Sequence, residues 1–242
     1  MKRFGRAATC LLAAALSAVF AVSGYQIWAI LQERQAAEAS YQELDSFLQF
    51  SRSDSDTGQP RQDGTATVAD GAALDVGAAD LSVSFPEVDF EGLRSINEQV
   101  VGWIYDESSV INYPIAQARD NDYYLHRMFN GDSNPCGCIF LDCRNQSDFS
   151  DSHCIVYGHH MKNGSMFAAL SNYKSQEYYE AHPRMFLLTP EGNYTIEIFA
   201  GYVAHVEDDA WVTGFASEAD YEAWIVAGIS KSLIQADFDA KP

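Results

Sequence analysis

The stretch CIVYGHHMKNGSMF, which runs from Cys154 to Phe167, decides how the rest of this chain is interpreted. Its first residues are apolar and β-branched, a pattern that is typical of a short buried strand. Gly158 then ends the strand, and His159 and His160 follow where the chain leaves the sheet. A strand that delivers a titratable group to the rim of a sheet often builds a site, although the pattern alone also fits two ordinary loop histidines.

Length and composition limit the class of protein. The 242 residues suffice for one domain with extensions, and a hydrophobic content of 47% excludes wholesale disorder. The formal net charge of −19 argues against nucleic acid as a partner, because phosphate binding needs basic patches. The same acidity argues against a polybasic attachment to anionic lipid.

The chain has five cysteines, of which Cys10 lies in the N-terminal apolar segment and four lie further along: Cys136, Cys138, Cys143 and Cys154. Structural zinc sites favour Cys pairs separated by two or more residues, and the Cys-Gly-Cys spacing differs from this. Residues two apart on a strand face the same way, which makes a disulfide between them awkward. We therefore predict free or partly paired structural thiols, no metal and no cofactor.

An apolar run from position 7 to 31 follows three basic residues, Lys2, Arg3 and Arg6. A membrane helix needs about 20 apolar residues, so this run predicts a transmembrane segment. Basic residues on its N-terminal side predict a cytoplasmic N-terminus and an extracytoplasmic remainder. A cleaved signal peptide is the alternative, because small residues precede Gly24, but the apolar run continues beyond that point and favours an uncleaved signal-anchor.

We divide the chain into three parts: residues 1–32, a cytoplasmic tip and transmembrane anchor; residues 33–84, a helical stalk and flexible linker; and residues 85–242, the folded domain. Ala, Glu, Gln and Leu dominate positions 33–50 and predict a helix. Positions 51–80 have no aromatic residue and are rich in Ser, Asp, Gly and Thr, so they predict a flexible spacer that lifts the domain off the membrane.

The folded part combines short strands with short helices. The residue patterns predict helices at 90–101, 121–129, 165–173, 176–181 and 217–233, and strands at 103–105, 110–115, 138–141, 153–157, 185–189 and 194–205. Such an order favours a mainly β domain, either a closed barrel or a sandwich with helical decorations. The sequence has no phosphate-binding loop and no dinucleotide fingerprint.

Three motifs resemble those of class B sortases: YGHHMKNGSMF at 157–167, GCIFLD at 137–142 and NDYYL at 121–125. The resemblance runs from about Phe90 to the C-terminus. Sortases are membrane-anchored cysteine transpeptidases of Gram-positive bacteria. The resemblance implies a sortase-type closed β-barrel that a single-pass anchor holds at the outer face of the cell membrane.

The resemblance also implies a reaction and its residues. In this family a cysteine thiolate cleaves the C-terminal sorting signal of a surface protein, of an NPxTN-like or similar kind, through a thioacyl-enzyme. An amine of the peptidoglycan cross-bridge or of a pilin then takes the acyl group. His159 matches the general acid and base, while Asn121, Leu125 and Tyr157 match positions that line the substrate groove; ordinary capping and core packing are the alternative for these three.

The sequence departs from the family at its end. The family's cysteine and arginine follow the helix that we expect at 217–233, and nothing in 230–242 resembles the Thr-Leu-Ser-Thr-Cys-like motif. We therefore expect a chain truncated before its last barrel strands and, as given, without transpeptidase activity. The alternatives are a non-catalytic extracytoplasmic peptide-binding module and a metal-binding domain that would use His153, His159 and the cysteines.

Overall fold

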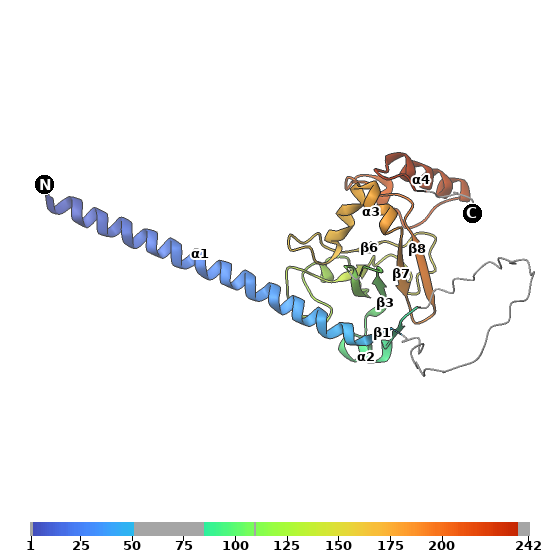
Figure 1. The fold of residues 1–242 in the computed structure, drawn as a ribbon, viewed down its shortest axis with the longest axis horizontal. Coiled ribbons are helices and arrows are strands. Elements are labelled where there is room, and N and C mark those ends of the chain that lie inside the picture. The colour runs from blue at the N-terminus through green and yellow to red at the C-terminus, as the bar shows by residue number, and fades with distance from the viewer. Residues whose placement is uncertain (1, 51–84, 109, 237–242) are drawn as a thin grey trace, which may run out of the picture.

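The computed structural model describes residues 2–50, 85–108 and 110–236. Figure 1 shows a long N-terminal helix, α1 (Lys2–Leu44), that projects from a folded unit built around a curled sheet. By length and composition, α1 can cross a membrane. The predicted flexible spacer lies outside the described residues.

The C-terminal part of α1 packs on the folded unit. Ala37 and Leu44 are buried against it, and the amide of Asn134 donates to the carbonyl oxygen of Glu33 at 2.9 Å. After α1 come the 3₁₀ turn η1 (Asp45–Phe47) and strand β1 (Leu48–Gln49), which pairs antiparallel with β2 (Glu87–Val88). The predicted stalk therefore shares a core with the domain.

The main sheet has six strands in the order β6-β5-β4-β3-β7-β8. Their bounds are β3 (Val100–Tyr105), β4 (Asn112–Ala116), β5 (Ile139–Leu141), β6 (Val156–Tyr157), β7 (Arg184–Leu188) and β8 (Asn193–Glu197). Neighbours are antiparallel except β4 and β5, which run parallel with Ile115 opposite Ile139. The mainly β fold with helical decorations is confirmed.

Both faces of this sheet are buried at its central strands β3, β4, β5 and β7. Trp103 packs in one cluster with Phe140 and Phe186, whereas Ile104 and Ile139 belong to a cluster on the other side. Successive side chains of a strand point to opposite faces, so a sheet covered on both sides needs apolar residues at consecutive positions. This requirement explains the uninterrupted apolar runs of the sequence.

Short helices connect the strands: α2 (Phe90–Ile96), η2 (Tyr123–Leu125), η3 (Phe167–Lys174), α3 (Gln176–Ala181), η4 (Asp209–Trp211) and α4 (Glu218–Lys231). The helix prediction at 90–101 was wrong in its C-terminal part, because Asn97 is extended and Val100 begins β3. The helix expected at 121–129 is only one turn, since the Asp120 carboxylate accepts from the backbone N–H groups of Asp122 and Tyr123. The strand expected at 194–205 ends at Glu197.

Packing of α1 on the domain predicts a stability difference between two leucines of the same helix. Leu44 is 3% exposed and Leu31 is 49% exposed. We expect Leu44→Ala to lower the free energy of unfolding of the detergent-solubilised chain by about 2–5 kcal/mol, because it opens a cavity. Leu31→Ala is the matched control and should change it by less than about 1 kcal/mol. If urea denaturation shows the same loss of stability for Leu44→Ala and Leu31→Ala, the packing of Leu44 on the domain is contradicted.

Candidate active site

His159 lies two residues beyond the end of β6, where Gly158 lets the chain pass close to the core. A Cβ at position 158 would lie 2.4 Å from Cδ1 of Ile139 and 2.6 Å from Cδ2 of Phe167, so only glycine fits. The Nε2 atom of His159 lies 2.8 Å from the carbonyl oxygen of Leu125. A carbonyl only accepts, so Nε2 carries the hydrogen and Nδ1 is the basic nitrogen of the neutral ring.

A second glycine packs against this hydrogen bond. Gly137 has a φ of +62°, and a Cβ there would lie 2.6 Å from the carbonyl oxygen of Tyr124, 2.9 Å from that of Leu125 and 3.1 Å from Cδ2 of His159. The loop before β5 therefore touches both partners of the imidazole hydrogen bond. No larger residue fits there without moving the Leu125 carbonyl or the ring.

The other candidate residues have different surroundings. Leu125 meets His159 through its backbone, and its partly buried side chain packs on the core. The side-chain oxygen of Asn121 accepts from the backbone N–H of Cys143 at 2.8 Å, which ties the turn before η2 to the end of β5. Their roles toward a substrate stay predictions.

Tyr157 belongs to a polar group that the sequence analysis missed. Its hydroxyl donates to Oδ2 of the buried Asp142 at 2.8 Å, and the guanidinium of Arg144 donates to both oxygens of that carboxylate at 2.7 and 2.9 Å. Trp211 stacks on Tyr157, and its carbonyl oxygen accepts from Arg144 at 3.1 Å. The sequence signal that could have predicted this group is an Asp and an Arg two residues apart, Asp142 and Arg144, directly after a strand.

Charge and burial set the protonation of this group. Burial raises the pKa of Asp142, but the hydrogen bonds from Arg144 and Tyr157 outweigh it and hold the pKa well below its usual range. Burial, and then the neighbouring carboxylate, raises the pKa of Tyr157 to about 12. Tyr157 thus stays a donor to an Asp142 that is ionised at neutral pH, and Arg144 donates to the same carboxylate.

The four cysteines beyond α1 are free thiols. Burial raises the pKa of Cys136 to about 11 and that of Cys138 to about 12, and it also raises the pKa of Cys154. A thiol attacks as its thiolate, so these three are poor nucleophiles. In the described part of the chain, no three His, Cys, Asp or Glu side chains are grouped to hold a metal ion, and the metal-binding alternative has no ligand set there.

Comparison with known proteins identifies the family. No family model matches the chain. It is 39% identical to sortase B of Listeria monocytogenes over 133 residues and 33% identical to sortase B of Staphylococcus aureus over 148 residues. These matches cover 55% and 61% of this chain, and 54% and 61% of the two relatives. The chain thus matches less than two thirds of either curated relative.

Solved structures agree. A sortase B–substrate complex from S. aureus aligns with a TM-score of 0.61 and 32% identity, covering 63% of this chain and 70% of that one. Sortase B from L. monocytogenes aligns with a TM-score of 0.58 and 35% identity, covering 62% of this chain and 86% of that one. The half-barrel sheet is therefore that of a sortase. The chain belongs to the class B sortase family, a family of cysteine transpeptidases.

The Asp142–Arg144–Tyr157 group predicts an acid-dependent loss of stability. A carboxylate whose pKa is lower in the folded than in the unfolded chain stabilises the fold above the unfolded value of about 4, and this contribution disappears as the pH falls through the folded value. We expect Asp142→Asn to cost about 1–3 kcal/mol at pH 7, measured by urea denaturation. Between about pH 5 and pH 2, the difference in free energy of unfolding between Asp142→Asn and the unmodified chain should shrink.

Glu197→Gln, at an exposed position of β8, is the control and should leave the free energy of unfolding nearly unchanged at every pH. A gap for Asp142→Asn that stays constant down to about pH 2 would contradict the assigned ionisation of Asp142.

Proposed function

We propose that this domain serves sortase-type transpeptidation, with His159 as the general acid and base. The observation that carries the proposal is the imidazole at the end of β6, whose Nε2–H is fixed by the Leu125 carbonyl. This hydrogen bond orients the ring and leaves Nδ1 available for proton transfer. Membership of the class B sortase family supplies the reaction class.

In the proposed reaction, a thiolate attacks a backbone carbonyl of a C-terminal sorting signal, NPxTN-like or similar, and forms a thioacyl-enzyme. His159 protonates the departing amine. An amine of a peptidoglycan cross-bridge or of a pilin then attacks the thioacyl carbon and gives its proton back to His159. Asn121, Leu125 and Tyr157 are the proposed groove residues. One of the aligned S. aureus sortase B structures is a complex with substrate, which supports peptide binding here.

The attacking thiolate is proposed to come from a residue other than Cys136, Cys138 and Cys154. Cys136, Cys138 and Cys154 all have a raised pKa, and the first two are buried. We further propose that the 242-residue chain by itself binds a sorting signal without cleaving it. The same observation favours the second candidate function, a non-catalytic extracytoplasmic peptide-binding module.

We also propose that α1 is a single-pass membrane anchor with a cytoplasmic N-terminus, so that the domain meets surface proteins outside the cell. Support comes from its length and apolar composition and from the basic residues Lys2, Arg3 and Arg6 at its start.

Two proteins test the proposed function: the 242-residue chain and a chimera that continues after position 236 with the C-terminal segment of the L. monocytogenes relative. Each is mixed with a fluorogenic NPxTN-like peptide. We expect the chain to bind without releasing fluorophore, and the chimera to cleave the peptide. His159→Ala in the chimera should lower kcat at least about 100-fold, since general acid–base catalysis is lost.

His160→Ala is the matched control and should change kcat by less than about threefold. Thiol-dependent cleavage by the 242-residue chain alone would contradict the proposed role of its cysteines. A chimera that keeps its kcat after His159→Ala would contradict the role of His159. Peptide binding by both proteins with no cleavage by the chimera would favour the binding module.

A further inference from the structure

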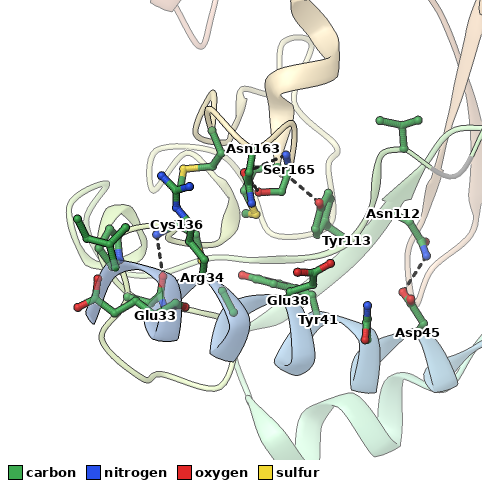
Figure 2. A pocket seen from close by; sticks show the side chains of 18 residues that line it. Glu33, Arg34, Glu38, Tyr41, Asp45, Asn112, Tyr113, Cys136, Asn163 and Ser165 are labelled. Atoms are coloured by element: carbon green, nitrogen blue, oxygen red, sulfur yellow. Dashed lines mark hydrogen bonds between the residues drawn. The ribbon is translucent and has the colours of Figure 1, made fainter. Parts of the chain in front are cut away.

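Tyr41 lies on the part of α1 that packs on the domain, at a groove of about 520 Å³ between α1 and the loops around His159. Figure 2 shows this groove, with Arg34, Glu38 and Tyr41 on the helix and Tyr113, Cys136 and Asn163 facing them. At this groove Tyr41 contacts two different segments of the domain. Each of these segments also contacts His159 or the loop that follows it.

The first contact is a hydrogen bond. The Tyr41 hydroxyl donates to the carbonyl oxygen of Gly137 at 2.8 Å. Gly137 in turn lies against the Leu125 carbonyl and the His159 ring so closely that no Cβ fits. A movement of the Gly137 peptide would therefore be transmitted to the acceptor of the His159 Nε2–H.

The second contact is aromatic. The Tyr41 ring packs edge-on against Tyr113, with centroids 5.3 Å apart and an interplanar angle of 87°. The Tyr113 hydroxyl accepts from the backbone N–H of Met166 at 2.9 Å. Met166 closes the loop that begins at His159, because it pairs with His160 and because the next N–H, that of Phe167, donates to the His159 carbonyl oxygen at 3.0 Å.

We propose that Tyr41 is a positioning residue for His159, through which the N-terminal helix fixes the tautomer and orientation of the imidazole. This proposal rests on the proposed function in one respect: it takes His159 to be the general acid and base. Two routes link Tyr41 to His159: one through Gly137, which lies against the ring, and one through Tyr113 and Met166, which close the loop after His159. In this proposal, a displacement of α1 at Tyr41 changes the orientation of the His159 imidazole.

The other contacts of α1 make a clean test feasible. The backbone carbonyl of Glu33 binds Asn134 independently of Tyr41, and Ala37 and Leu44 are buried. Directly after α1, Asp45 of η1 accepts from Asn112. Tyr41→Phe removes only the hydroxyl, so the helix should stay in place while the Gly137 carbonyl loses its donor.

The experiment uses the full 242-residue chain in detergent micelles, with histidine labelled by ¹⁵N. Ring ¹⁵N shifts and the solvent exchange rate of the His159 Nε2–H are measured at pH 8.5, and His159 is assigned from its loss in His159→Gln. We expect Tyr41→Phe to speed this exchange roughly fivefold, the effect of one lost hydrogen bond, and to move the ring shifts away from the pure Nε2–H tautomer.

Tyr194→Phe is the matched control, because Tyr194 is an exposed tyrosine of β8 outside the groove, and it should leave both signals unchanged. Tyr113→Phe removes the second route and should act in the same direction as Tyr41→Phe; it serves as the decisive variant if circular dichroism finds Tyr41→Phe unfolded.

Three results would overturn the proposal: signals in a folded Tyr41→Phe that equal those of the unmodified chain, an equal change in Tyr194→Phe, or a proton on Nδ1 in the unmodified chain. Each is independent of turnover. If His159→Ala leaves the chimera active, the proposed function fails while the coupling to Tyr41 is still measured.

Discussion

The hydrogen bond between the His159 imidazole and the Leu125 carbonyl is the contact on which the rest of the site depends. It joins the loop after β6 to the turn at η2, two segments far apart in the sequence. Gly137 and Gly158 make it possible, because a side chain at either position would collide with the core or with the bond itself. The protonation of the His159 Nε2 atom is thus set by the backbone of Leu125, against which Gly137 packs closely.

Helix α1 adds a constraint that reaches from outside the sheet. It contributes buried side chains to the core, and its polar contacts fall on the loops that surround His159 rather than on the strands. Loops are ordinarily the most mobile part of a domain, and a site built on them needs support from packed elements. In this chain the support comes partly from the helix that also carries the candidate membrane span.

Local sequence patterns predict many of the strands and helices. The contacts between distant segments were not predicted, because no local pattern determines them. The alternation and apolar runs predicted the strands around Trp103 and Ile139, and α3 was placed at its observed bounds, because local patterns determine these elements. The local pattern marked His159 and His160 as candidates, and the resemblance then selected His159 and added Leu125. The side-chain partners of Asp142 were missed. The docking of α1 could not be foreseen either, since Tyr41 and Gly137 are 96 residues apart and no local pattern links them.

Helix α1 runs from its apolar segment to the groove that the loop after His159 also lines. Photocrosslinking from benzoylphenylalanine in place of Glu38, with the chain in lipid nanodiscs, tests this placement of α1 most directly. Glu38, Met161 and Asn163 all line this groove. We expect intramolecular crosslinks, mapped by mass spectrometry, to the peptide that contains residues 161–166. Crosslinks confined to lipid, with none to the domain, would contradict this placement.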